Sequence, residues 1–169
     1  IDHQMGGQLC ALRPDKTLKC WGFPNTIEIP SGPFLDVSLY KDNACAVRTN
    51  NEVVCWGKGY SSLNSPSGGF KSVEAGVYRS CGLKEDGTFV CWGQNSVSTV
   101  QYFQPGRLLD DPAGFTQLLN GGDMTVLGGI TTDQRLVVNN FGWTFWPTYF
   151  SGKFIDASGW WGLLCAITA

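Results

Sequence analysis

The seven cysteines are the residues of this sequence whose type and spacing are best suited to chemistry. Thiols can hold a metal, act as nucleophiles or join as disulfides. Six of them fall into three pairs of equal spacing, namely Cys10 and Cys20, Cys45 and Cys55, and Cys81 and Cys91. No pair has the C-x-x-C spacing of zinc ribbons and thioredoxin-like motifs, and Cys165 stands alone. The pattern therefore favours disulfides over metal binding or redox catalysis.

The segment between the cysteines of each pair has the composition of a β-hairpin. CALRPDKTLKC, CAVRTNNEVVC and CGLKEDGTFVC each hold an apolar stretch, a turn and a second apolar stretch. A loop centred on Asp15, Asn50 or Asp86 suits a type I turn followed by a left-handed residue. Such a hairpin places Leu12 opposite Leu18, and each first cysteine opposite its second, at Cα separations of about 4.5 to 5.5 Å that a disulfide can bridge. We therefore predict the disulfides Cys10–Cys20, Cys45–Cys55 and Cys81–Cys91.

A fourth copy of the unit lacks both cysteines. GGITTDQRLVVNN begins at Gly128 and aligns Asp133 with the turn residues of the other copies, which puts Gly128 and Val138 at the two cysteine positions. Both thiols are missing together, as expected for a bonded pair, because a single remaining thiol would be reactive. The comparison supports pairing inside each repeat.

The units recur along the chain at a period typical of repeat folds. The cysteine pairs follow each other after 35 and 36 residues, and Phe34, Phe70 and Phe154 each begin a shared block ahead of a first cysteine. Such periods are typical of solenoids, propellers and arrays. The 22 glycines and 8 prolines are scattered between short β-type stretches, so we predict an all-β fold. The expected repeats cover residues 1–33, 34–69, 70–114 and 115–153, with a partial repeat at 154–169.

The Cys-Trp-Gly ending of each complete unit, with the Phe-led strand and the Asp or Asn turn, resembles the repeats of the regulator-of-chromosome-condensation superfamily. The sequence looks like their secreted, cysteine-paired branch, which includes the ectodomains of crinkly-type plant receptor kinases and bacterial surface repeat proteins. The resemblance implies a β-propeller. The glycine-rich loop that usually follows Trp-Gly in the intracellular members is absent here, so transfer of their nucleotide-exchange function is weakened.

Cys165 raises the question of how the propeller ring is closed. The chain holds about four and a half repeats, and the partner of Cys165 would fall beyond residue 169. Two interpretations remain open: the chain is a piece of a longer polypeptide, or another chain completes the ring. We favour the first, because an odd cysteine in an oxidising setting is a liability. Cys165 is thus expected to be unpaired or paired outside this segment.

Composition excludes several classes of function. The net charge of −2, with 15% charged residues and no run of Lys or Arg, argues against nucleic-acid binding. No apolar run approaches the roughly 20 residues that span a bilayer, so no membrane insertion is expected. His3 is the single histidine, which excludes a multi-histidine metal site and gives little support to a histidine-based triad. We expect no enzyme, no cofactor and no metal, and the predicted disulfides favour an extracellular or cell-surface location.

Two segments differ between the copies and are therefore candidates for binding. The long connection between the third and fourth copies carries Tyr102, Phe103 and Arg107, a combination typical of protein-binding hot spots. The second segment is rich in aromatic residues, including Tyr149 and the tryptophans Trp143, Trp146, Trp160 and Trp161. These rings suit a sugar-stacking surface or an apolar patch for a neighbouring chain, and equally could refill the core where the disulfide is lost.

The recurrent tryptophans Trp21, Trp56 and Trp92 are expected to pack between blades rather than to form a site. Our leading hypothesis is a non-enzymatic extracellular binding module for a protein partner, part of a receptor ectodomain or surface assembly. One alternative is a lectin-like, carbohydrate-binding propeller that uses the tryptophan-rich segment. The other is a structural subunit of an extracellular filament.

Overall fold

The computed structural model consists of short antiparallel strands. It describes residues 2–3, 9–22, 28–41, 43–57, 65–76, 79–93, 113–120, 126–140, 148–160 and 163–169. The strands are β1 (Asp2–His3), β2 (Leu9–Leu12), β3 (Leu18–Trp21), β4 (Phe34–Tyr40), β5 (Asn43–Arg48), β6 (Val53–Gly57), β7 (Phe70–Glu74), β8 (Arg79–Lys84), β9 (Phe89–Gly93), β10 (Phe115–Asn120), β11 (Val126–Thr131), β12 (Leu136–Asn140), β13 (Thr148–Phe150), β14 (Phe154–Trp160) and β15 (Leu163–Thr168).

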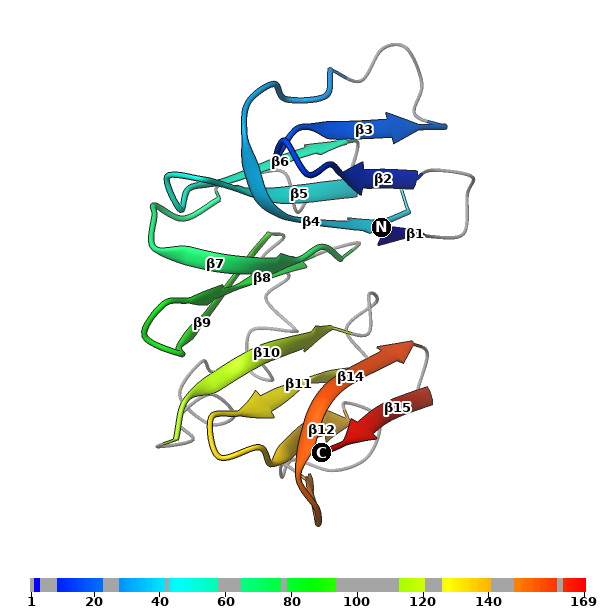
Figure 1. The fold of residues 1–169 in the computed structure, drawn as a ribbon, viewed down its shortest axis with the longest axis vertical. Coiled ribbons are helices and arrows are strands. Elements are labelled where there is room, and N and C mark those ends of the chain that lie inside the picture. The colour runs from blue at the N-terminus through cyan, green and yellow to red at the C-terminus, as the bar shows by residue number, and fades with distance from the viewer. Residues whose placement is uncertain are drawn as a thin grey trace.

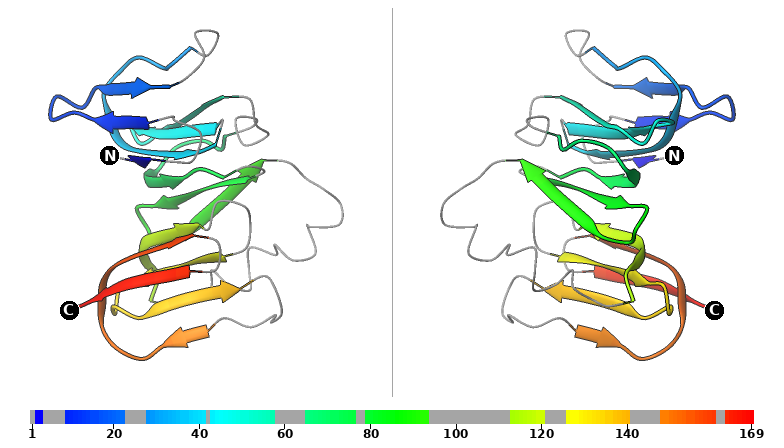
Figure 2. Two further views of the ribbon diagram at one scale, coloured as in Figure 1. Left: turned by 90° about the vertical axis from the view of Figure 1, so that its right-hand side faces the viewer. Right: turned by 90° about the vertical axis from the view of Figure 1, so that its left-hand side faces the viewer.

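The strands form five sheets in chain order. The first sheet is β1-β2-β3, the second β4-β5-β6, the third β7-β8-β9, the fourth β10-β11-β12-β13 and the fifth β14-β15. The sheets follow one another in an open arc, with the first and the fifth at its two ends (Figures 1 and 2). This is the architecture of a propeller whose ring is not closed, so the predicted all-β, propeller-type fold is confirmed.

The hairpin registers agree with those expected from the cysteine spacing. Leu12 pairs with Leu18, and Cys10 with Cys20. The cysteines of the second and third sheets pair in the same way, and Gly128 pairs with Val138 at the equivalent place in the fourth sheet. The three disulfides Cys10–Cys20, Cys45–Cys55 and Cys81–Cys91 are formed, with Cα–Cα distances of 4.1, 4.0 and 4.0 Å.

The hairpin turns are of the expected kind, and they also join neighbouring sheets. The last residue of each turn has a positive φ: 65° at Lys16, 66° at Asn51, 83° at Gly87 and 67° at Gln134. The carbonyl oxygen of each accepts a hydrogen bond from the N–H that opens the next sheet, that of Phe34, Phe70, Phe115 and Phe154, over 2.7, 3.0, 3.0 and 2.9 Å. The turns of the second, third and fourth sheets accordingly lie on the same side of the molecule (Figure 1, left).

In the first and third turns, the aspartate at the centre stabilises the loop. Oδ1 of Asp15 accepts hydrogen bonds from the backbone N–H and the hydroxyl of Thr17. Oδ1 of Asp86 accepts the same two bonds from Thr88. These bonds favour the carboxylate form and lower the pKa of both side chains below the ordinary value of aspartate, with the side-chain bond as the larger cause.

The core lies between the sheets, because the facing sides of successive sheets are buried against each other. One face carries the cysteine pair, or its replacements in the fourth sheet, and is here called the cysteine face. The opposite face is called the tryptophan face. The first disulfide packs against Phe34, Leu39 and Trp56 of the second sheet, and equivalent clusters fill the next three boundaries. At each boundary, the tryptophan face of one sheet covers the cysteine face of the sheet before it.

The tryptophans follow this scheme in two cases out of three. Trp56 and Trp92 are buried, with 6% and 8% of their surface exposed. Trp21 is 47% exposed, so the expectation that it packs between blades is wrong for this residue. The reason is its position: the tryptophan face of the first sheet is not covered by another sheet in the described structure.

Two of the opening phenylalanines, Phe70 and Phe115, lie across a glycine of the neighbouring strand. Phe70 lies over Gly82, where an added Cβ would approach the Cδ1 of the ring to 2.5 Å. Phe115 lies over Gly129 in the same way, at 2.7 Å. In the second sheet the equivalent residue is Ala46, which is fully buried. The position after the first cysteine is therefore limited to Gly or Ala by the ring above it.

Replacing Gly82 with Val should destabilise the fold, because the branched side chain would collide with Phe70 and with Trp92. Overpacking of this kind costs about 1 to 3 kcal/mol. The free energy of unfolding from urea denaturation measures the loss. Ala46→Gly is the matched control, which removes one methyl group at the equivalent position and tests deletion rather than overpacking. An unchanged denaturation midpoint in Gly82→Val would contradict the packing described.

Removing one disulfide should weaken its hairpin. The variant Cys81→Ala with Cys91→Ala opens a loop with a sequence separation of 10, and loss of such a short loop closure costs about 2 to 3 kcal/mol. Cys165→Ala is the control, because this exposed cysteine is unpaired and its removal should change stability by less than about 0.5 kcal/mol. Equal effects of the two changes in urea denaturation would show that the bridge adds no stability.

Candidate functional site

Most residues that the sequence nominated for binding lie outside the described part of the chain. These are Tyr102, Phe103, Arg107, Trp143, Trp146 and Trp161. Trp160 ends β14, where its backbone pairs with Leu163, and its side chain is outside the description. The proposed binding roles of all seven residues therefore stay predictions. The described residue of the aromatic segment is Tyr149, so the candidate site is built around it.

Tyr149 belongs to β13, a fourth strand at the outer edge of the fourth sheet. The strand pairs with β12 through Leu136 opposite Phe150, Val137 opposite Tyr149, and Val138 opposite Thr148. In the described residues no other sheet has a fourth strand. Tyr149 is 53% exposed and Phe150 42%. These two rings therefore do not refill the core, and they place aromatic surface beside a strand edge that no other described strand pairs with.

The two rings extend the two faces of the fourth sheet beyond its neighbours. Val137, opposite Tyr149, is buried against the third sheet, whereas Leu136, opposite Phe150, is buried against the fifth. Side chains alternate along a strand, so Tyr149 and Phe150 point to opposite faces. β13 thus adds one exposed aromatic ring to each face of the fourth sheet, at its outer edge.

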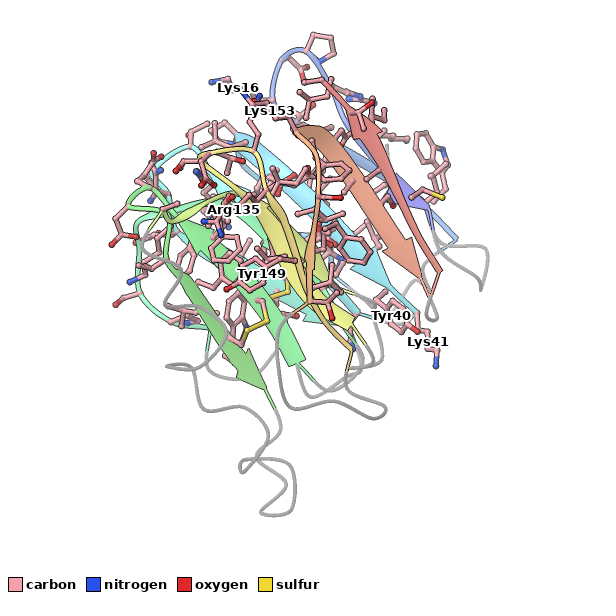
Figure 3. All side chains as sticks on the ribbon, turned by 90° about the horizontal axis from the view of Figure 1, so that it is seen from below. Lys16, Tyr40, Lys41, Arg135, Tyr149 and Lys153 are labelled. Carbon is pink, nitrogen blue, oxygen red and sulfur yellow. A yellow bond between two sulfur atoms is a disulfide. The ribbon has the colours of Figure 1, made fainter. Side chains whose placement is uncertain are left out.

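An arginine orders the surface next to Tyr149. The guanidinium of Arg135 lies over the ring, 5.5 Å from its centroid (Figure 3). Its Nε also donates to Oδ2 of Asp133 over 2.8 Å. On the other side, Asp133 accepts a hydrogen bond from the hydroxyl of Thr131, which is fully buried. The arginine is therefore held between a fixed carboxylate and an exposed ring.

The electrostatics of this cluster follow from those bonds. The hydroxyl of Thr131, and then the guanidinium of Arg135, lower the pKa of Asp133 below the ordinary aspartate value. The turn thereby differs from those of the other sheets, where the central carboxylate or amide accepts a backbone N–H two residues on. In the fourth sheet the central residue instead orients a cation on the surface.

The backbone of the fourth sheet leaves no room for a side chain at the first cysteine position. A Cβ added to Gly128 would lie 2.2 Å from the carbonyl oxygen of Val137 and 2.9 Å from the Cα of Val138. Both atoms belong to the backbone and cannot move aside cheaply. The hairpin is therefore too close at this point for a cysteine.

The arrangement suits binding. Arg, Tyr and Phe side chains dominate the energetics of protein interfaces, and an unpaired strand edge offers free N–H and C=O groups. Within the described ranges no three His, Cys, Asp or Glu side chains come together to hold a metal ion. The described part of the chain also contains no helix long and apolar enough to cross a bilayer.

Sequence reasoning missed β13 as an element, although a signal was present. Thr148, Tyr149 and Phe150 all favour strands, and the run is bounded by Pro147 on one side and by Ser151 and Gly152 on the other. The aromatic content of the segment alone does not indicate this strand.

The fold and its repeats define a propeller-type repeat protein, and comparisons with known proteins agree. Residues 70–98 match the Regulator of chromosome condensation (RCC1) repeat. Over 51 residues the chain is 41% identical to the Serine/threonine-protein kinase-like protein CCR4 of Arabidopsis thaliana, which corresponds to 30% of this chain and 6% of that protein.

Solved structures show the same likeness. The CRINKLY WD40 ectodomain of the Arabidopsis thaliana receptor kinase ACR4 is 25% identical, with a TM-score of 0.59 over 83% of this chain and 49% of that one. Prp20p from Saccharomyces cerevisiae is 12% identical, with a TM-score of 0.67 over 91% of this chain and 52% of that one. The resemblance to the regulator-of-chromosome-condensation superfamily, and to its cysteine-paired branch, is confirmed. The chain spans about half the length of these two structures.

Removing the guanidinium should raise the pKa of Asp133. In Arg135→Met, the second cause of the lowered pKa is gone, so the carboxyl should titrate closer to its ordinary value of 3.8. A lowered folded-state pKa contributes stability above the unfolded-state pKa, and this contribution is lost as pH falls through the folded-state pKa. The variant should therefore lose less stability on acidification. The carboxyl carbon resonance of Asp133 reports the midpoint by NMR, with Lys153→Met as the control, and an unchanged midpoint would contradict the pairing.

Proposed function

We propose that this protein is an extracellular, non-enzymatic binding module for a protein partner. We further propose that the partner contacts the outer edge of the fourth sheet, at Arg135, Tyr149 and Phe150. The observation that carries the proposal is the pair of exposed rings on the outermost described strand of the fourth sheet, with a guanidinium held over one of them.

The disulfides support the extracellular part of the proposal. Each disulfide joins the two strands of one hairpin within its own repeat. The first cysteine of each pair is buried. Such bridges form and persist in oxidising compartments and are rare in the reducing cytosol. The likeness to a receptor-kinase ectodomain at 25% identity agrees with this location.

The chemistry of the edge supports a protein partner. Tyr and Arg are among the residue types enriched at interface hot spots, because both combine a large contact area with hydrogen-bonding groups. The salt bridge with Asp133 and the contact with Tyr149 hold Arg135 in place before binding, which reduces the cost of ordering it on complex formation. An edge strand can in addition pair its backbone with an extended segment of the partner.

The test is the binding of the fluorescently labelled, oxidised protein to intact cells of its own organism. We expect saturable binding that Tyr149→Ser and Arg135→Ala each weaken about tenfold or more, as for hot-spot residues. Lys41→Ala is the matched control. It removes another cation from an aromatic ring, that of Tyr40 at 5.5 Å, in a different part of the molecule (Figure 3), and should leave the affinity unchanged.

Treatment of the cells identifies the class of partner. Trypsin digestion of surface proteins should abolish binding, whereas removal of glycans should not. Trypsin-resistant binding that is lost with the glycans, together with binding on a glycan array, would replace the proposal with the lectin-like alternative. Binding that is equal in Tyr149→Ser, Arg135→Ala and the wild type would remove the fourth-sheet edge as the contact surface.

A further inference from the structure

The first strands of the second to fifth sheets share a β-bulge. In each of β4, β7, β10 and β14 the register shifts directly after the opening phenylalanine (strands labelled in Figure 1). The residue that follows the bulge therefore occupies one equivalent position in all four strands, here called the linking position. The residues at the linking position are Asp36, Ser72, Gln117 and Asp156.

At the boundary between the second and third sheets, the residue at the linking position binds the backbone of the next sheet. Oδ2 of Asp36 accepts a hydrogen bond from the N–H of Val73 in β7 over 2.9 Å. Two residues further along the strand, the hydroxyl oxygen of Ser38 accepts the N–H of Ala75 over 3.0 Å. Both Val73 and Ala75 are buried. Separating these two sheets therefore breaks directional hydrogen bonds as well as apolar contacts.

The boundary between the fourth and fifth sheets has a link of the same kind. The side-chain amide of Gln117 pairs with the backbone of Ala157 in β14. Its Oε1 accepts the N–H of Ala157 over 3.3 Å, and its Nε2 donates to the carbonyl oxygen over 2.8 Å. Nε2 also donates to Oδ1 of Asp156 over 2.9 Å. Ala157 is the equivalent of Val73, because each follows the linking position of its own strand, so the same backbone position is bound at both boundaries.

The boundary between the third and fourth sheets differs at this position. The linking residue of β7 is Ser72, whose hydroxyl oxygen is bonded directly to Cβ and so reaches less far than the carboxylate of Asp or the amide of Gln. Among the described residues, Ser72 makes no side-chain hydrogen bond to β10. Nζ of Lys71 does lie near the carbonyl oxygen of Phe115, but at 3.4 Å, which is longer than an ordinary hydrogen bond. The rings of Phe89 and Phe115, with centroids 4.5 Å apart, form the apolar contact here.

We propose that the arc opens at the boundary between the third and fourth sheets, and that the fourth and fifth sheets move there as one unit. Apolar contacts such as that of Phe89 with Phe115 are non-directional, so they close a boundary without fixing it as hydrogen bonds do. Local opening is expected where the least free energy holds neighbouring elements together. The opening is a property of the unbound protein, so it is independent of the proposed binding function.

Amide hydrogen exchange, measured residue by residue with NMR on the oxidised protein, tests the proposal. The N–H groups of Phe70 and Phe115 each bond to the turn of the preceding sheet over 3.0 Å, so each reports the opening of its own boundary. After correction for intrinsic rates, the protection of Phe115 should be about fivefold or more below that of Phe70, which corresponds to the net contribution of about one hydrogen bond. The amides of β11 that bond within the fourth sheet should stay better protected than Phe115. Equal protection of Phe70 and Phe115 would overturn the proposal, and so would exchange of β11 as fast as that of Phe115.

Reciprocal substitutions test whether the linking position is the cause. Ser72→Gln supplies the side chain of Gln117 at the boundary between the third and fourth sheets, and should raise the protection of Phe115 about fivefold while that of Phe70 stays the same. Asp36→Ser supplies the side chain of Ser72 at the preceding boundary and should lower the protection of Phe70 by a similar factor. Ser72→Ala is the matched control, because it removes the hydroxyl without lengthening the side chain, and should leave Phe115 unchanged. If Ser72→Gln does not protect Phe115, or Asp36→Ser does not expose Phe70, the linking position does not decide where the arc opens and the proposal fails.

Discussion

The structure depends on a backbone hydrogen bond that each repeat makes with the next. The last residue of every described turn is left-handed, and its carbonyl oxygen accepts the N–H of the phenylalanine that opens the following sheet. Because this carbonyl is fixed by the hairpin, the phenylalanine and its sheet begin at a fixed place. The ring then lies over the small residue after the first cysteine position, as Phe70 does over Gly82. The hairpin turn therefore determines both its own loop and the stacking of the sheets.

Much of this could be predicted from the sequence because the information repeats. Equal spacing of cysteines around Asx-centred turns gave the hairpins, their registers and the disulfides, since a hairpin allows one partner for each cysteine. The missing pair at Gly128 and Val138 could be aligned for the same reason. What the repeats could not give was the environment at the ends of the arc. Trp21 has the sequence context of Trp56, yet it is exposed, because burial depends on a neighbour and not on the residue itself.

The candidate site was less predictable, because it lies where the repeats stop agreeing. Composition identified the aromatic segment, but composition does not say which rings face the core. Pairing of β13 with β12 places Tyr149 and Phe150 at the surface, and Arg135, which belongs to the turn of the fourth hairpin, reaches Tyr149 only through that pairing. The contact joins residues with no recognisable relation in the sequence. The contact of Arg135 with Tyr149 therefore follows from the sheet register alone.

The missing disulfide and the added strand of the fourth sheet can be understood together. A bridge in a hairpin of this size stabilises by about 2 to 3 kcal/mol, and the backbone at Gly128 leaves no room for one. β13 adds the pairs Leu136 with Phe150, Val137 with Tyr149 and Val138 with Thr148, each worth about 0.2 to 1 kcal/mol. Their sum, about 0.6 to 3 kcal/mol, overlaps that of the bridge at its upper end. A strand added at the outside of a sheet is paired on one side, however, so the same stabilisation leaves aromatic rings and an open edge in solvent. In this repeat, stability gained without a disulfide and a surface suited to binding have one structural origin.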